Sequence, residues 1–262
     1  MRRKTLGSKS VRKNQMSHWP VILSGSGHEG LADRLARRHG LAVLVVPDIC
    51  DLPSDHLALP AMQEVAGPIC FGSQHLPRAA HWLLAWHGVK GRRAEGDDTQ
   101  APGRRIRPVC LAGCTEQEAA DRILAATGGG GGHGSVHSVV DRLGRRWYPV
   151  IDYDRCTGCL ACVEYCALGT FGVADKRVRV VAPGNCKPGC PTCAWTCPAG
   201  AIMFPRYAGG GPVAGEDAGR PERLEGRALR QAVTRSIRQW TKGEGRPAAP
   251  PKTADSASAG LE

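Results

Sequence analysis

The chain's twelve cysteines are unevenly distributed, since eight of them fall within the 42 residues from Cys156 to Cys197. They form two similar patterns, CxxCxxCxxxC beginning at Cys156 and CxxxCxxCxxxC beginning at Cys186. Three thiols within seven or eight residues can bind three corners of a cubane iron–sulfur cluster. This spacing therefore predicts a small unit folded around metal clusters.

Zinc is the main competing metal for these thiols. Structural zinc sites usually pair two short CxxC-type knuckles across a longer gap. Here each group places four cysteines within eleven or twelve residues, which is too crowded for two separate knuckles. The spacing favours two [4Fe–4S] clusters, with zinc as the alternative.

The basic net charge of the chain bears on the kind of partner that it can bind. The formal net charge is +11, and two oxidised cubanes at roughly −2 each would lower it to about +7. Lysine and arginine are concentrated at residues 1–13, 92–107 and 220–246, largely outside the apolar segments. We interpret them as solvated tails and linkers, and expect a redox protein partner rather than nucleic acid.

The compartment is predicted from what the sequence lacks. The N-terminus opens with Arg2-Arg3, but no apolar stretch of a signal peptide follows. No run of 18 apolar residues is present, so we expect no membrane span. Clustered thiols in such a chain are typical of metal binding in the cytoplasm rather than of disulfides.

Residues 18–127 alternate short apolar runs with helical periodicity. Strands are expected at 21–23, 41–46, 65–71 and 106–111, and helices at 29–39, 77–87 and 115–126. The last helix begins with Thr115-x-x-Glu118, the pattern of a capping box. The alternation predicts a small parallel sheet covered by helices, an α/β module in which 92–105 is a charged loop.

The rest of the chain divides into four parts. Residues 1–17 are expected to be disordered, and residues 128–144, which open with five glycines, to be a Gly-rich linker. Residues 145–207 form the cysteine domain, with terminal strands at 147–151 and 201–204 and a hairpin of 170–173 and 177–181. Residues 208–262 are a Gly/Pro-rich tail with one amphipathic helix at 222–240 and a disordered end. The predicted fold class is α/β followed by α+β.

The cysteine domain resembles the two-[4Fe–4S] bacterial ferredoxins, whose motif ends in a Cys-Pro pair like Cys197-Pro198. In that family the first three cysteines of each motif share a cluster with the last cysteine of the other. The resemblance implies one cluster on Cys156, Cys159, Cys162 and Cys197, and a second on Cys186, Cys190, Cys193 and Cys166. The chain departs from the family at Ala167, where proline is usual, and by one extra residue within Lys187-Pro188-Gly189. We therefore expect the two clusters to be inequivalent.

Residues 147–153 and 201–207 also resemble a little-characterised bacterial group of ferredoxin-like proteins that carry an N-terminal α/β domain. Residues 48–50, Cys70 and residues 77–83 are similar to the N-terminal module of that group, and distantly to modules attached to heterodisulfide reductases and hydrogenases. A cysteine is expected near the end of the first strand of such modules, where this chain has Ser24 and Ser26. The resemblance implies electron transfer, as a carrier or a subunit of a redox complex, rather than a stand-alone enzyme. It names neither donor nor acceptor.

Four further cysteines lie in the N-terminal module: Cys50, Cys70, Cys110 and Cys114. The expected strands end near all four, which would place them along one edge of a parallel sheet, where ligands bind in open α/β folds. We interpret them as small buried hydrophobes. A redox-active dithiol or a metal site is the alternative.

A glycine pattern, Gly25-x-Gly27-x-x-Gly30, follows the first strand and opens a helix, and Asp48 ends the second strand. This is the outline of a dinucleotide fingerprint, in which the glycines admit a pyrophosphate and the acid binds a ribose hydroxyl. With about 110 residues the module holds little more than one mononucleotide half, so a tight strand–helix turn is the simpler interpretation. A small nucleotide-dependent oxidoreductase is the second functional hypothesis, and an iron–sulfur redox sensor the third.

Overall fold

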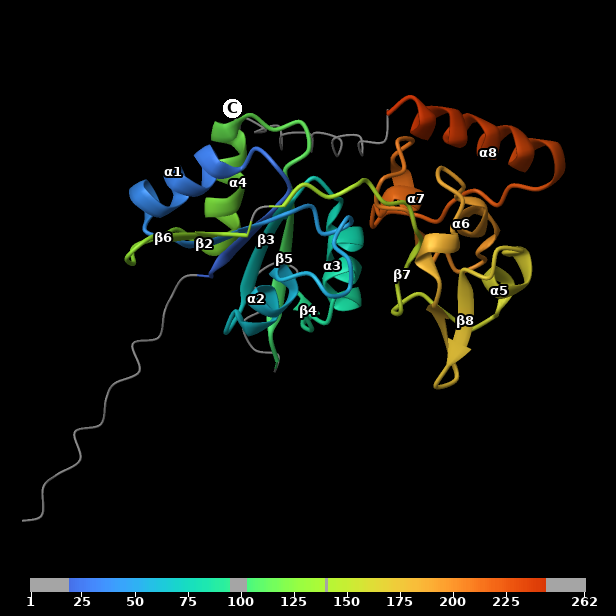
Figure 1. Cartoon of the computed structure of the whole chain (residues 1–262), viewed down its shortest axis with the longest axis horizontal. Coiled ribbons are helices and arrows are strands. Elements are labelled where there is room, and N and C mark those ends of the chain that lie inside the picture. The colour runs from blue at the N-terminus through green and yellow to red at the C-terminus, as the bar shows by residue number, and fades with distance from the viewer. Residues whose placement is uncertain (1–18, 95–102, 140, 244–262) are drawn as a thin grey trace, which may run out of the picture.

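Two units follow each other along the chain, an α/β unit up to residue 139 and a cysteine-rich unit from residue 141 (Figure 1). The structure, a computed structural model, describes residues 19–94, 103–139 and 141–243. The segments expected to be disordered, 1–17 and the end of the tail, lie outside the described residues.

The α/β unit is built on a six-stranded sheet in the order β4-β5-β3-β1-β2-β6, and every neighbouring pair is parallel. The strands are β1 (Val21–Ser24), β2 (Ala42–Val46), β3 (Ile69–Ser73), β4 (Arg92–Arg93), β5 (Arg105–Cys110) and β6 (Ser135–Ser138). The chain runs outward from β1 in both directions, so the carboxyl ends of β1 and β3 flank a topological switch point.

Helices cover both faces of this sheet, as its parallel strands require. One face packs against α1 (Glu29–His39) and α4 (Glu116–Thr127), the other against α2 (Ala58–Glu64) and α3 (Pro77–Trp86). The capping box of Thr115 and Glu118 is present at the start of α4. The predicted parallel sheet is therefore confirmed, with two more strands than expected.

The segment expected to be a Gly-rich linker instead contains β6, which pairs with β2. Its glycines allow close packing: a Cβ at Gly130 would lie 1.7 Å from the carbonyl oxygen of His39, and one at Gly134 2.0 Å from that of Ala36. Gly130 and Gly134 thus cross the end of α1 at points where no side chain fits, because only glycine permits such an approach. The expected charged loop likewise contributes the two-residue strand β4.

The cysteine-rich unit contains two small antiparallel sheets. Strand β7 (Val150–Ile151) pairs with β10 (Ile202–Met203), and β8 (Phe171–Ala174) pairs with β9 (Arg177–Val180). Asp175 and Lys176, at φ 52° and 59°, give the hairpin its left-handed two-residue turn. The helices are α5 (Ala161–Tyr165), α6 (Thr192–Thr196), α7 (Gly211–Ala214) and α8 (Gly226–Thr241), with a 3-10 turn at Pro183–Asn185. In the described part of the chain, no helix has the length and apolar character needed to cross a membrane.

The two units share one hydrophobic core. Tyr148, Val150 and Met203 of the cysteine-rich unit are buried in the same cluster as the side chains of α2 and α3. On α3, Trp86 packs against Tyr148 at 6.1 Å between ring centroids. The α/β unit therefore holds the cysteine-rich unit directly, rather than being tethered to it by a flexible segment.

Burial of His87 at the end of α3 makes the stability of the fold pH-dependent. Burial lowers the pKa of His87 to about 4, while its Nε2–H donates to the carbonyl of Ile49 at 3.0 Å. The unfolded chain binds a proton near pH 6.5, so the stabilisation is complete above that pH and is lost as the pH falls toward 4. We expect unfolding free energy to drop by about 2 kcal/mol from His87 between about pH 7 and pH 5.

The measurement is urea unfolding of the full chain at both pH values, with His87→Gln as the comparison. The variant is expected to lose less stability on acidification than the unaltered chain. Burial also lowers the pKa of His28 and His81, so an acid-dependent component remains in the variant. An equal loss in both proteins would contradict the assignment to His87.

Candidate metal centre

Four cysteines from both motifs line one small cavity in the cysteine-rich unit: Cys156, Cys159, Cys162 and Cys197. Ile151, Leu160, Val178 and Ile202 form much of its wall. The first motif supplies three of the thiols through the loop that leads into α5, and the fourth comes from the end of α6. These are the four that the ferredoxin resemblance groups together.

The sulfur of Cys162 lies within electrostatic reach of the other three. Burial raises the pKa of Cys162, and together with the charges of Cys197, Cys156 and Cys159 brings it to about 12. Several thiolates this close repel one another unless a cation neutralises them. Metal binding to such a site therefore releases the protons of the thiols. The donor set is therefore suited to a cationic iron–sulfur core.

The second motif repeats the arrangement with a cysteine from the first. Burial raises the pKa of Cys186, and together with the charges of Cys190 and Cys166 brings it to about 12. Burial is also the largest cause of the raised pKa of Cys193, and the charges of Cys186, Cys190 and Cys166 are the next largest causes. Cys162 of the first group also acts on Cys193, so the two groups of thiols adjoin.

Hydrogen-bond donors surround the sulfur of Cys166. Burial opposes its ionisation, but the backbone N–H groups of Thr170, Leu168 and Gly169 together lower its pKa. In the other group, the N–H of Ala201 donates to Cys197 Sγ at 3.4 Å. Such N–H···S bonds stabilise thiolate ligands and tune the potential of a cluster.

The surroundings of the two groups differ. In the first, Cys159 is exposed, and Leu160 is 41% exposed with a left-handed backbone at φ 64°. In the second, α8 covers the loop before Cys190: a Cβ at Gly189 would lie 2.7 Å from the Cα of Ile237. Because solvent exposure helps to set cluster potentials, this asymmetry supports the expected inequivalence.

The spacing of the side chains bears on the zinc alternative. Over residues 19–94, 103–139 and 141–243, no three His, Cys, Asp or Glu side chains converge tightly enough for a single metal ion. One zinc draws four sulfurs to about 2.3 Å from a common centre, whereas each thiolate of a cubane binds a different iron. Zinc stays the alternative prediction for these thiols.

The four N-terminal cysteines do not converge. Cys50 and Cys70 lie in the cores on opposite faces of the sheet, and burial raises the pKa of each to about 12. Placing Cys70 at the end of its strand was wrong: β3 begins at Ile69, after Gly67-Pro68, and Cys70 pairs with Val21 at the start of β1. Only Cys110 and Cys114 are neighbours, and burial raises the pKa of Cys110.

The glycine turn forms as expected, with Gly25 at φ 123° and Gly27 at φ 80°, but Asp48 is already paired. His75 Nε2 donates to Asp48 Oδ1 at 2.8 Å, and Arg206 Nη2 lies 2.9 Å from Oδ2. Against the effect of burial, His75 and then Arg206 lower the pKa of Asp48 well below its usual range. The hollow beside the turn is lined by further carboxylates, Glu29, Asp51 and Asp141, which oppose a phosphate ligand. Nucleotide binding through Gly25, Gly27, Gly30 and Asp48 stays an untested prediction.

Arg78 joins the two units, a role that its place in the sequence does not predict. This arginine lies in the first turn of α3, is 2% exposed, and places its guanidinium in the cysteine-rich unit. Nη1 donates to Asp152 Oδ2 and to the carbonyl of Gly200, both at 3.2 Å, and Nη2 donates to the carbonyl of Pro212 at 2.7 Å. The available signal was a charged residue within the otherwise apolar helix that follows Pro77.

Comparison with known proteins yields matches to iron–sulfur proteins. A family model described as a 4Fe-4S binding domain matches residues 147–168. A Methanocaldococcus jannaschii protein named as an uncharacterized ferredoxin is 38% identical over 60 residues, which cover 22% of this chain and 41% of that protein. The chain thus spans about two fifths of the length of this relative. These matches support an iron–sulfur, ferredoxin-like protein with a general role in electron transport.

Proposed function

We propose that this chain transfers electrons through two [4Fe–4S] clusters. The residues that would hold the first are Cys156, Cys159, Cys162 and Cys197; those for the second are Cys166, Cys186, Cys190 and Cys193. The observation that carries this proposal is that thiols of the two motifs lie together. Cys197 lines the same cavity as Cys156, Cys159 and Cys162, and Cys166 acts on the pKa of Cys186 and Cys193. When bound, such clusters supply one-electron chemistry.

The rest of the chain holds and insulates the thiols. Apolar side chains such as Ile151 and Val178 line the first group, and Trp147 borders the second, donating its indole N–H to the carbonyl of Cys190 at 3.3 Å. The α/β unit anchors this arrangement through Arg78, which pairs with Asp152, and through Asp48, which pairs with Arg206 of the cysteine-rich unit. We propose that it supports a carrier, or a subunit of a redox complex, with a redox protein as partner.

A reductive titration tests the function. We expect the anaerobically reconstituted chain to take up about two electrons from dithionite, one for each cluster, with the EPR signals of reduced [4Fe–4S] centres. NADH or NADPH alone is expected to leave the clusters oxidised, because carboxylates border the glycine turn. Reduction by a nicotinamide alone would favour the oxidoreductase hypothesis, and absence of any reducible centre would exclude electron transfer.

A further inference from the structure

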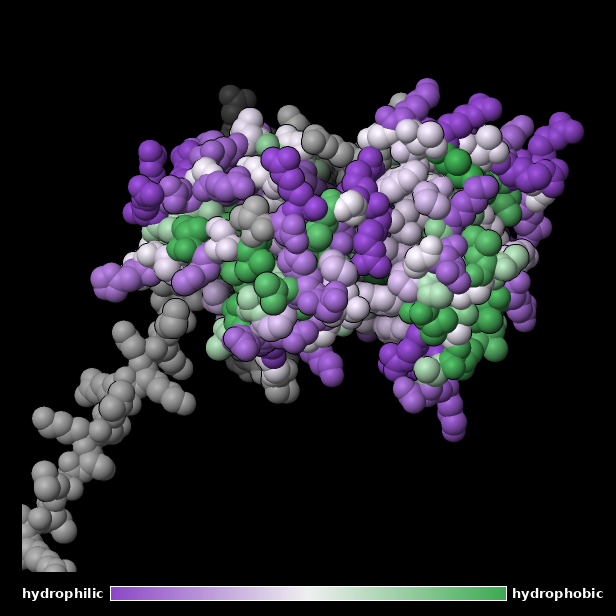
Figure 2. Space-filling model, in the orientation of Figure 1, coloured by the Kyte–Doolittle hydropathy of each residue, from purple (hydrophilic) through white to green (hydrophobic). Residues whose placement is uncertain are grey.

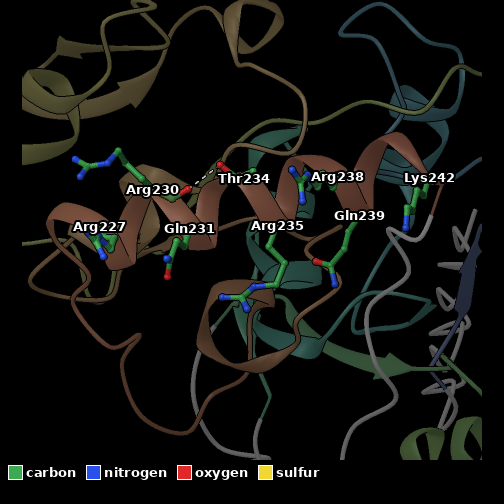
Figure 3. A pocket seen from close by; sticks show the side chains of 8 residues that line it. All are labelled: Arg227, Arg230, Gln231, Thr234, Arg235, Arg238, Gln239 and Lys242. Carbon is green, nitrogen blue, oxygen red and sulfur yellow. Dashed lines mark hydrogen bonds between the residues drawn. The ribbon is translucent and has the colours of Figure 1, made fainter.

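One side of α8 is strongly basic. Five exposed cations follow its length, separated by three to five residues, with three polar side chains between them (Figure 3). We call this surface the basic face of α8: Arg227, Arg230, Arg235, Arg238 and Lys242, with Gln231, Thr234 and Gln239. No aspartate or glutamate lies within the helix.

The positive charge of this face is not balanced within the described part of the chain. Among residues 19–94, 103–139 and 141–243, no ion pair involves any of the five cations. The neighbouring carboxylate Glu225 pairs with Arg223 instead. Like charges three or four residues apart destabilise a helix, whereas α1 relieves its own with the pair Arg37–Asp33. An external anionic surface would remove this repulsion.

The opposite side of α8 packs on the second group of thiols. The Cα of Ile237 covers Gly189, which precedes Cys190. Trp240 meets Trp147 edge-on at 5.0 Å between ring centroids, and Trp147 in turn donates to the carbonyl of Cys190. A partner on the basic face would thus be separated from this loop by one helix, about 10–12 Å in diameter.

The chemistry of the face indicates the class of partner. Guanidinium groups bind carboxylates through paired hydrogen bonds, and the lining contains no large apolar side chain, which is typical of a transient, electrostatically steered encounter. Figure 2 shows hydrophilic side chains along α8 and an apolar patch near α5 and β8. The exposed apolar side chains of the cysteine-rich unit include Leu160, Leu168 and Val173, so its apolar surface is chemically distinct from the basic face of α8.

We propose that the basic face of α8 docks an acidic redox protein, which exchanges electrons with the cluster proposed for Cys166, Cys186, Cys190 and Cys193. One electron passes between the reduced partner and the oxidised cluster, or in the reverse direction, without a bond being made or broken. This inference rests on the proposed function. The position of the basic face above the second thiol group favours a redox protein over nucleic acid as the source of the carboxylate or phosphate charge.

The test uses the reconstituted full chain and an acidic flavodoxin as the probe. Stopped-flow electron exchange and calorimetric binding are measured from about 20 mM to about 300 mM salt, a range over which screening becomes strong. Both the rate constant and the affinity are expected to fall at least about tenfold with salt. The double variant Arg235→Glu/Arg238→Glu is expected to lose about tenfold or more of each at low salt.

The matched control is Arg37→Glu/Arg38→Glu on α1, which makes the same change of charge at exposed positions at the far end of the molecule (Figure 1). It is expected to retain most of the rate and affinity. Iron content and dithionite reduction are measured on every variant; their absence in the unaltered chain would refute the proposed function itself. If iron content and dithionite reduction are intact, equal losses of rate and affinity in the two double variants would overturn the docking proposal. The docking proposal would also be overturned if the chain bound duplex DNA more tightly than flavodoxin and the α8 double variant lost this DNA binding.

Discussion

Two double variants with the same number of lost thiols are expected to differ fully in cluster content. Cys156→Ala/Cys197→Ala removes two ligands of one proposed cluster and should retain about four iron atoms per chain. Cys156→Ala/Cys166→Ala removes one ligand from each proposed cluster and should retain almost none. The reason is the proposed exchange of the last cysteine between motifs, which is supported by the shared cavity of Cys162 and Cys197 and by the effect of Cys166 on the pKa of Cys186.

Iron and acid-labile sulfide after anaerobic reconstitution measure this difference, and far-UV circular dichroism monitors the fold. Each variant is the control for the other. If each motif bound its own cluster, the results would be reversed: Cys156→Ala/Cys166→Ala would keep about four irons, and Cys156→Ala/Cys197→Ala almost none. That reversal would refute the proposed ligand sets while leaving two clusters in place.

Loss of the Arg78 guanidinium is expected to lower the free energy of unfolding and to weaken the contact between the two units. Arg78→Ala removes the buried cation of Asp152, which is 3% exposed and keeps only Arg155 Nε at 3.5 Å, and it removes donors from the carbonyls of Gly200 and Pro212. Breaking a buried ion pair by removing one member typically costs about 3–5 kcal/mol. Because the contact joins the units, we also expect the single unfolding transition to broaden or split.

Urea unfolding followed by circular dichroism gives the free energy, and Arg37→Ala is the comparison. Arg37 makes an exposed pair with Asp33 one helical turn away at 2.9 Å, and such pairs contribute less than about 1 kcal/mol. Losses of similar size in the two variants would show that Arg78 does not join the units. Retention of iron in Arg78→Ala would locate the effect in the contact between units rather than in the thiol groups.

Local chemistry made several elements predictable from sequence. The Thr115–Glu118 capping box and the hairpin around Asp175 and Lys176 depend on residues that are adjacent in the chain, and both are confirmed. The paired terminal strands β7 and β10 also follow from two apolar runs that flank the motifs. The eight ligands follow from cysteine spacing in the same way, although their assignment stays a prediction.

Contacts between distant segments account for what the sequence did not reveal. Five consecutive glycines are typical of a linker, and only the position of α1 shows that they allow a close crossing before β6. Asp48 matches a ribose-binding acid in sequence, yet Arg206, more than 150 residues later, reaches its carboxylate. Burial of Arg78 likewise depends on acceptors at residues 152, 200 and 212.

The content of iron and acid-labile sulfide in the unaltered, anaerobically reconstituted chain tests the central claim most directly. Two [4Fe–4S] clusters predict about eight atoms of each per chain. A value near four would leave one proposed ligand set empty. Stoichiometric zinc with neither iron nor sulfide would contradict the account, because the thiol groups would then be structural sites without redox chemistry.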